Sequence, residues 1–271
     1  MPKTADGTDA VPGHGGWPTL TARLLGPMMV TLNGRVVDTA SSRRTRYLLG
    51  YLLLHRRSAV PRDVLMDTFW PDARPAAARN SLHVALTGVR RVLADACPEP
   101  VLERRHGGYR LAPELPVWVD VDDFELCRRG GQQAQRSGDG ETARAAYAAA
   151  DRLYGGDLLA EDPYAEWAAL ARETLRLDLL DTLRQLAKLH AAAGDPAAAV
   201  LVARRALDID PCNEPVHRQL MRSYRDTGQV HLALIQFHRC AEELWRNHRV
   251  RPGVETVALH ETLRRPIGRT A

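Results

Sequence analysis

The chain has 271 residues, of which 45% are hydrophobic, so it is long enough to bury the cores of two domains. No run of about 18 apolar residues occurs, and we therefore expect neither a membrane-spanning helix nor a membrane partner. The formal net charge of +4 is unevenly distributed. Residues 20–113 hold 15 arginines against 7 acidic residues, whereas residues 131–271 hold 19 basic and 19 acidic residues. This excess suggests a polyanionic partner for the first part of the chain, and the alternative is that so many arginines reflect a GC-rich genome.

The cysteines and the first residues indicate a cytoplasmic protein. No CxxC pair occurs, and the widely separated cysteines are expected to be free thiols of a reducing cytoplasm: Cys97, Cys127, Cys212 and Cys240. Residues 1–17 are rich in glycine and lack the apolar stretch of a signal peptide. We interpret them as a disordered lead.

The elements of the first part are predicted in chain order. Residues 21–40 alternate in polarity and break at Asn33-Gly34, which predicts short antiparallel strands with a hairpin turn. Ser41 or Ser42 is expected to cap a helix over about 43–56. The buried side of that helix is predicted to carry Leu48, Leu49, Leu52 and Leu53.

Two more helices and a second hairpin complete the predicted domain. Pro61 suits the first turn of a helix over 61–69, and a third helix is expected over 75–95. The stretch VLERRHGGYRLA predicts two strands around Gly107-Gly108. Strands, three helices and a terminal hairpin make a winged helix-turn-helix, with boundaries at 18–113.

The third helix has an unusual outer face. With 100° per residue, its apolar side chains share one side: Leu82, Ala85, Leu86, Val89, Val92 and Leu93. The opposite side and its borders carry Arg79, Asn80, His83, Val84, Thr87, Arg90 and Arg91. Short polar groups beside a methyl group, bordered by guanidinium groups, suit a DNA major groove, and Gly88 adds no bulk. An ordinary solvated helix face is the alternative.

Two further features point to the same partner. The hairpin tip carries Arg104 and Arg105, and an arginine at a narrow tip can enter a DNA minor groove, although a solvated basic turn is the alternative. Trp70 precedes Pro71, which places its indole N–H near the loop between two helices, unless it belongs to the core.

The segment of residues 113–123 has two interpretations. Its two prolines and acidic run are consistent with a flexible tether, in which Asp122 or Asp123 caps the next helix. Alternatively it forms a strand packed on the first domain, with Val117, Val119 and Val121 facing inward.

The second half of the chain contains helical repeats. Aligned on Gly138, Gly194 and Gly228, small residues coincide, and the last two glycines are 34 residues apart, the tetratricopeptide period. Residues 163–193 are expected to form a long helix. We predict a mainly α fold with small β elements, in which a TPR-like helical-repeat domain occupies residues 114–265 and a tail occupies 266–271. Such repeats bind other proteins or one another.

No enzyme motif is found. There is no GxxxxGK[ST] phosphate-binding loop and no GxSxG nucleophile, and Arg264 occupies the second histidine position of a zinc-protease helix beginning at His260. We therefore expect no catalytic residues, no cofactor and no metal. Two other classes remain: a helical-repeat scaffold or peptide-binding protein whose basic domain docks on an acidic partner, and an enzyme with an unrecognised site in the helical half.

Both halves resemble known families. RNSLHVALTGVRRVL followed by VLERRHGGYRL resembles the OmpR-type winged-helix domain, and the resemblance implies that Asn80, Val84, Thr87 and Gly88 face bases, that Arg105 is the wing residue and that Trp70 touches phosphate. Many relatives have a long polar residue where this chain has Gly88.

The second half resembles the bacterial transcriptional activator domain, through GDLLAEDPYAEWAALARETL and the repeats after it. The two domains joined resemble the SARP family of pathway-specific activators. That resemblance implies an activator of an antibiotic gene cluster, which binds direct repeats near a promoter as a homodimer or cooperatively and recruits RNA polymerase holoenzyme.

Overall fold

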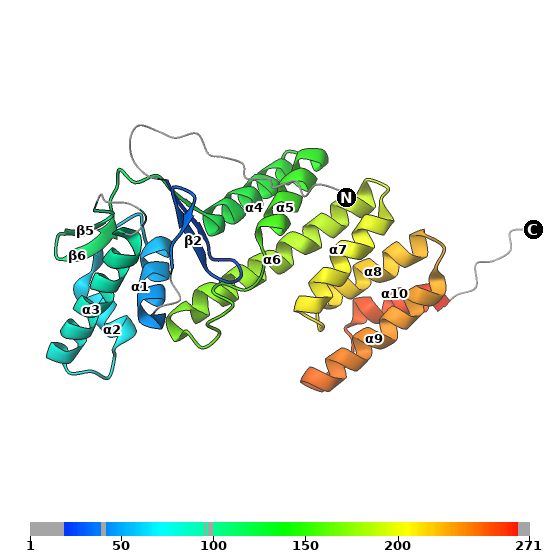
Figure 1. The fold of residues 1–271 in the computed structure, drawn as a ribbon. Coiled ribbons are helices and arrows are strands. Elements are labelled where there is room, and N and C mark those ends of the chain that lie inside the picture. The colour runs from blue at the N-terminus through cyan, green and yellow to red at the C-terminus, as the bar shows by residue number, and fades with distance from the viewer. Residues whose placement is uncertain (1–18, 39–41, 95, 97–99, 265–271) are drawn as a thin grey trace, which may run out of the picture. The chain divides into compact units, whose positions relative to one another are not determined.

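The computed structural model describes residues 19–38, 42–94, 96 and 100–264, which form two compact units (Figure 1). The first, here called the N-terminal unit, comprises the described residues up to Asp122 together with Leu158–Leu170. The second, the helical unit, comprises Asp123–Asp157 and the described residues from Ala171 onward. The predicted single division between residues 113 and 114 therefore differs from that of the structure. The predicted lead and tail lie outside the described residues.

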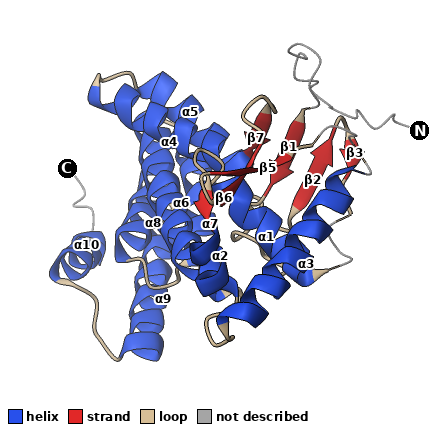
Figure 2. Cartoon of the chain, turned by 90° about the vertical axis from the view of Figure 1, so that its left-hand side faces the viewer, coloured by secondary structure: helices blue, strands red, loops and turns tan. Residues whose placement is uncertain are grey.

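A four-stranded sheet of order β3-β2-β1-β7 belongs to the N-terminal unit (Figure 2). Its strands are β1 (Leu20–Arg23), β2 (Met29–Leu32), β3 (Arg35–Val36) and β7 (Val117–Val119). Asn33 and Gly34 connect β2 to β3 with φ angles of 52° and 75°, the left-handed conformations typical of a two-residue hairpin turn. The predicted hairpin is confirmed.

Strand β7 decides between the two interpretations of residues 113–123. It pairs in parallel with β1, and both Val119 and Val121 are buried, while Val117 is half-buried. The strand interpretation is confirmed and the flexible tether is wrong. The next helix begins at Asp120, before the predicted capping residues. The buried Asp120 carboxylate accepts hydrogen bonds from the N–H groups of Leu24 and Leu25, which fixes the start of this helix against the segment after β1. Burial raises the pKa of Asp120.

Three helices follow the predicted order: α1 (Arg43–Leu54), α2 (Arg62–Phe69) and α3 (Pro75–Ala94). Ser42 caps α1 by accepting the N–H of Thr45, at 3.3 Å, and the four predicted leucines of α1 are buried. Pro61 lies in the short strand β4 (Val60–Pro61) rather than in the first turn of α2, since Val60 pairs with Tyr109.

A second sheet of order β4-β6-β5 completes the winged helix, with β5 (Leu102–Arg105) and β6 (Gly108–Leu111) antiparallel. The turn consists of His106 and Gly107, at φ angles of 49° and 77°, one residue earlier than predicted. Gly108 belongs to β6, where a Cβ atom would lie 2.4 Å from the carbonyl oxygen of Val60. Gly108 therefore lets β4 approach β6 closely, and it is not one of the two turn residues.

The rest of the chain is helical. Its elements are α4 (Asp120–Arg136), α5 (Gly140–Leu153), α6 (Glu166–Ala192), α7 (Pro196–Ile209), α8 (Glu214–Asp226), α9 (Val230–His248) and α10 (Val254–Arg264). Gly138, Gly194 and Gly228 precede α5, α7 and α9 with φ angles of 81°, 77° and 74°. The aligned residues Ala143, Ala199 and Ala233 are fully buried, because a small side chain lets paired helices approach. The predicted TPR-like repeat is confirmed.

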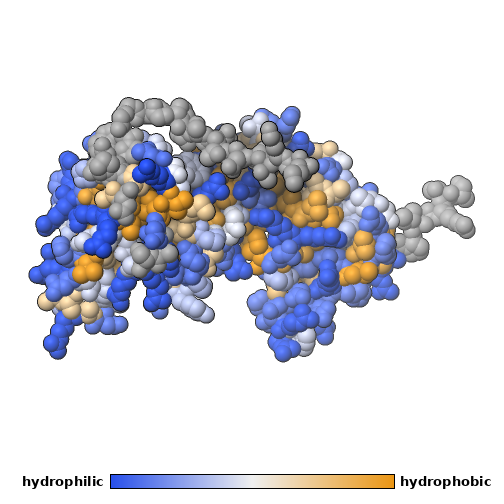
Figure 3. Space-filling view, viewed as in Figure 1, coloured by the Kyte–Doolittle hydropathy of each residue, from blue (hydrophilic) through white to orange (hydrophobic). Residues whose placement is uncertain are grey.

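The surface of the molecule is mostly hydrophilic on the face drawn in Figure 3, where apolar side chains form separate patches. None of the helices in the described ranges is long and apolar enough to span a membrane. Cys127, Cys212 and Cys240 are free thiols, and Cys97 lies outside the described residues.

Candidate nucleic-acid interface

Helix α3 has a buried side and a polar, basic side, as its periodicity predicts. Its buried residues include five of the six predicted, Val92 being half-buried: Leu82, Ala85, Leu86, Val89 and Leu93. The other side is exposed along its length and carries Arg79, Asn80, His83, Val84, Thr87, Arg90 and Arg91. Val84 is 70% exposed, which is unusual for a valine in a helix and leaves its methyl groups available to a ligand.

A groove with a volume of about 500 Å³ runs along this exposed side of α3 and the N-terminal end of α1. Ser42 and Thr45 line it from α1, and Val84, Thr87 and Arg91 line it from α3. The Thr87 hydroxyl donates to the carbonyl oxygen of His83, at 2.9 Å. Thr87 therefore offers a ligand its methyl group and the lone pairs of its hydroxyl, rather than a free O–H donor.

Gly88 has a packing role that the sequence did not predict. A Cβ atom at Gly88 would lie 2.4 Å from Oγ1 of Thr45, a buried residue of α1. The missing side chain therefore faces α1, and the glycine permits α1 and α3 to pack closely. Gly88 also lines the groove beside α3, and a close approach of DNA to its backbone stays a prediction.

The arginines of α3 and of the hairpin are not neutralised. Arg79, Arg90 and Arg91 are exposed and form no salt bridge with any carboxylate in the part of the chain that the structure describes. The same holds for Arg104 and Arg105, which end strand β5 directly before the His106-Gly107 turn. These guanidinium groups can bind phosphate oxygens without first breaking an ion pair.

The indole N–H of Trp70 is buried, in agreement with the core alternative. Trp70 ends α2, and Nε1 is buried without a hydrogen-bond partner among the described residues. Its ring packs against Phe69, with centroids 5.9 Å apart, and the Arg44 guanidinium lies 5.4 Å from the ring centroid. The burial of Nε1 argues against a phosphate contact through this N–H, and a phosphate contact by Trp70 stays a prediction.

Sequence reasoning missed Arg43 and Arg44, which are exposed in the first turn of α1. The positive end of the helix dipole and the unsatisfied N–H groups of a first turn attract anions, and this turn borders the groove beside α3. The signal was present in the run SSRRTR, where two arginines directly follow a capping serine. These two residues join the set of candidate phosphate contacts.

The residues Leu158–Leu170, here called the docking segment, belong to the N-terminal unit although they follow α5 in sequence. The N–H of Leu159 donates to the carbonyl oxygen of Leu24 at 2.9 Å, and the N–H of Ala160 donates to that of Gly26 at 3.0 Å. The Glu161 carboxylate accepts the N–H of Met28. The docking segment thus supplies hydrogen-bond partners to backbone groups between β1 and β2.

An ion pair attaches the docking segment to α1. Asp162, which is 8% exposed, accepts hydrogen bonds from Arg46 Nε, at 2.8 Å, and from the Tyr47 hydroxyl, at 3.1 Å. Burial is the largest of the causes that raise the pKa of Tyr47, and its hydrogen bond to Asp162 is the second. Because both partners are shielded from water, this pair constrains α1 more than an exposed ion pair would.

Trp167 inserts into an aromatic cluster of the N-terminal unit. Its ring lies edge-on to Tyr47, Tyr51 and Phe69, with centroids 6.2, 5.4 and 5.9 Å apart. A Cβ atom at Gly50 of α1 would lie 3.7 Å from the Trp167 ring, so the indole covers α1 directly. The docking segment therefore completes the core on which α1 rests, and α1 in turn packs on α3.

Comparisons with known proteins agree with this geometry. Residues 38–111 match the family described as transcriptional regulatory protein, C terminal, and residues 119–264 match the bacterial transcriptional activator domain. The transcriptional regulatory protein MoaR1 of Mycobacterium tuberculosis is 26% identical over 246 residues, which cover 90% of this chain and 79% of MoaR1. The regulatory protein DnrI of Streptomyces peucetius is 29% identical over 257 residues, which cover 89% of this chain and 91% of DnrI.

A solved structure shares the fold over both units. EmbR of Mycobacterium tuberculosis, in complex with a low-affinity phosphopeptide, superimposes with a TM-score of 0.77 at 26% identity and covers 91% of this chain. This chain spans 65% of that EmbR chain. Because the activator-domain match covers more than half of the chain and follows a winged helix, the protein belongs to the bacterial transcriptional activator domain family and is a transcriptional regulator of the SARP type.

Proposed function

We propose that this protein acts as a sequence-specific activator of an antibiotic biosynthetic gene cluster, and not as an enzyme, and that it binds promoter direct repeats and recruits RNA polymerase holoenzyme. The observation that carries the proposal is the exposed side of α3. That helix contains three arginines and no acidic residue, so nothing on it repels a phosphate backbone. The antibiotic pathway rests on the SARP resemblance and on the similarity to DnrI of Streptomyces peucetius.

Base recognition is assigned to the middle of the exposed side of α3. Asn80 can bond adenine, and the methyl groups of Val84 and Thr87 can contact thymine. We expect Asn80→Ala or Thr87→Ala to weaken binding to the cognate site by about 1–3 kcal/mol and to relax sequence preference. Fluorescence anisotropy with cognate and single-base variant duplexes measures both effects.

Arg79 and Arg90 provide the matched controls on the same helix. Arg79→Ala and Arg90→Ala are expected to weaken cognate and random duplexes by the same factor, since phosphate contacts carry no sequence information. If all four alanine variants lost specific and random binding equally, the assignment of base-facing residues would be wrong.

The hairpin β5–β6 is proposed to place Arg105 in a minor groove. An A·T-rich minor groove is narrow and strongly negative, so Arg105→Ala should reduce affinity most when the flanking sequence is A·T-rich. Arg104→Ala is the control, because we assign Arg104 to phosphate alone. Equal losses on A·T-rich and G·C-rich flanks would limit Arg105 to a phosphate contact.

Two copies are proposed to bind adjacent direct repeats about one helical turn apart, each from the same side of the duplex. A symmetric homodimer could place both winged helices in the same orientation only if a flexible tether joined the two domains, but residues 113–123 form β7 and the start of α4. A head-to-tail contact between the two copies therefore suits direct repeats better. Binding to two repeats is then cooperative. Contacts with polymerase are assigned in part to the surface of the winged helix.

Footprinting of the full chain on DNA upstream of its neighbouring genes tests this function, followed by transcription with purified RNA polymerase holoenzyme. We expect the protein to protect two direct repeats, and we expect increased transcription only from a promoter that carries both repeats. A chain that protects no duplex would support the other class, a helical-repeat scaffold with a basic docking domain. If the protein protected the repeats but did not increase transcription, it would bind DNA without being an activator.

A further inference from the structure

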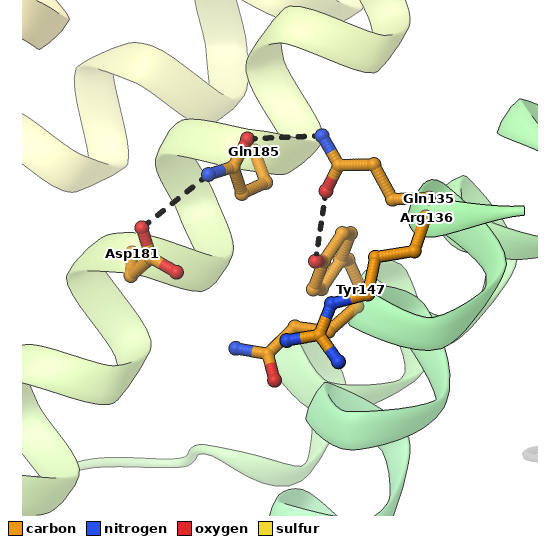
Figure 4. A pocket seen from close by; sticks show the side chains of 6 residues that line it. Gln135, Arg136, Tyr147, Asp181 and Gln185 are labelled. Atoms are coloured by element: carbon orange, nitrogen blue, oxygen red, sulfur yellow. Dashed lines mark hydrogen bonds between the residues drawn. The ribbon is translucent and has the colours of Figure 1, made fainter. Parts of the chain in front are cut away.

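A polar groove with a volume of about 330 Å³ lies entirely within the helical unit. Figure 4 shows its side chains, which come from the end of α4, from the middle of α5 and from the facing side of α6. They are Gln132, Gln135, Arg136, Tyr147, Asp181 and Gln185. All six lining residues belong to the helical unit, and none belongs to the winged helix.

The floor of this groove is rigidly built. The Tyr147 ring is 1% exposed and contacts the α4 backbone, where a Cβ atom at Gly131 would lie 2.7 Å from the ring. The Tyr147 hydroxyl donates to Oε1 of Gln135 at 3.0 Å, and burial raises the pKa of Tyr147, so it remains a neutral donor. The side chain of Gln135 is thereby held in one orientation.

A chain of amide groups crosses from α4 to α6. Gln135 Nε2 donates to Gln185 Oε1 at 3.3 Å, and Gln185 Nε2 donates to Asp181 Oδ1 at 3.5 Å (Figure 4). Each glutamine NH₂ group keeps a second N–H, and each amide oxygen keeps a second lone pair. Oriented amides with spare donors and acceptors match the repeating N–H and C=O groups of an extended polypeptide.

The groove carries one uncompensated charge. Asp181 is paired with Arg184, and Arg128 nearby is paired with Asp178. Arg136 is exposed, extends from α4 toward the groove in Figure 4, and forms no salt bridge within the described ranges. A ligand that places a carboxylate beside this guanidinium gains a charge-assisted hydrogen bond.

We propose that this groove binds an extended acidic segment of a partner protein, with its main chain on the glutamine amides and one carboxylate on Arg136. The groove is open and lined by polar groups, whereas sites for small organic ligands are enclosed and mostly apolar. An extended peptide needs neither enclosure nor an apolar floor, because its main chain supplies the hydrogen bonds.

Side-chain amide resonances in ¹H–¹⁵N spectra of the full chain report on the groove directly. The probe is a capped heptapeptide of alternating glycine and aspartate, and its lysine counterpart is the charge control. We expect the aspartate peptide to shift the NH₂ signals of Gln132, Gln135 and Gln185, and Arg136→Gln to weaken its binding about tenfold. Arg239→Gln is the matched control on α9, and it should leave the affinity unchanged.

Three results would overturn the proposal. If the lysine peptide bound equally well, or if Arg136→Gln left the affinity unchanged, the guanidinium would not bind a carboxylate of the ligand. If millimolar aspartate peptide did not shift the glutamine signals, the groove would not be a peptide-binding site. If free N-acetylglutamate bound as tightly as the heptapeptide, the ligand would be a small carboxylate and the peptide proposal would be wrong.

Discussion

Replacing Trp167 by alanine is expected to destabilise the N-terminal unit by about 3 kcal/mol, although Trp167 lies in the second half of the sequence. The substitution removes the ring that contacts Tyr47, Tyr51 and Phe69 and leaves a cavity above α1. Hydrogen exchange of the α1 amides measures the local loss of stability. DNA affinity should fall as well, because α1 supports α3 through Thr45.

Trp245→Ala is the matched control. Trp245 is 54% exposed on α9 and its ring contacts Arg249, so its removal should cost at most about 1 kcal/mol and leave the α1 amides unchanged. If Trp167→Ala left the exchange of α1 unaltered, the docking segment would not be part of the core of the N-terminal unit.

The same reasoning predicts that a chain ending at Asp122 binds DNA poorly, because it lacks Leu158–Leu170.

Gly88→Ala is expected to cost about 1–3 kcal/mol, the usual effect of overpacking. The new methyl group would lie 2.4 Å from Thr45 Oγ1, and Thr45 is buried and β-branched, so it cannot turn aside freely. Because α3 must then move relative to α1, affinity for the cognate duplex should fall with stability. Thermal unfolding and anisotropy titration of the same variant measure the two losses.

The double variant Thr45→Ala with Gly88→Ala separates packing from DNA contact. Removing Oγ1 leaves room for the methyl group, and alanine favours a helix over glycine, so stability and DNA affinity should both recover. A Gly88→Ala variant that stays fully stable but loses affinity would instead indicate that Gly88 touches DNA directly.

The parts of the fold that depend on local periodicity could be predicted from the sequence. The 3.6-residue period of α3 placed Leu82 and Leu86 inside and Asn80 and Thr87 outside, and the structure agrees. The Ser42 cap and the left-handed glycines that precede α5, α7 and α9 are equally local, because a cap or a left-handed residue acts within one turn of its position.

The parts that depend on distant contacts could not be predicted. Leu158 of the docking segment pairs with Leu25, and no local sequence pattern predicts a pairing between residues so far apart in the chain. The packing of Gly88 and Trp70 could not be predicted for the same reason, since α1 supplies Thr45 beside one and Arg44 beside the other. Both residues look available for DNA when α3 and α2 are considered alone.

The affinity of the full chain for a footprinted site and for a scrambled duplex of equal length, measured across a range of salt concentrations, tests the central claim most directly. We predict that the site binds about 10³-fold or more tightly than the scrambled duplex. For both duplexes, log affinity should fall linearly with log salt concentration, because arginines that are free of salt bridges replace condensed counterions. Equal affinity for the two duplexes, or binding that salt does not weaken, would contradict sequence-specific DNA recognition by α3.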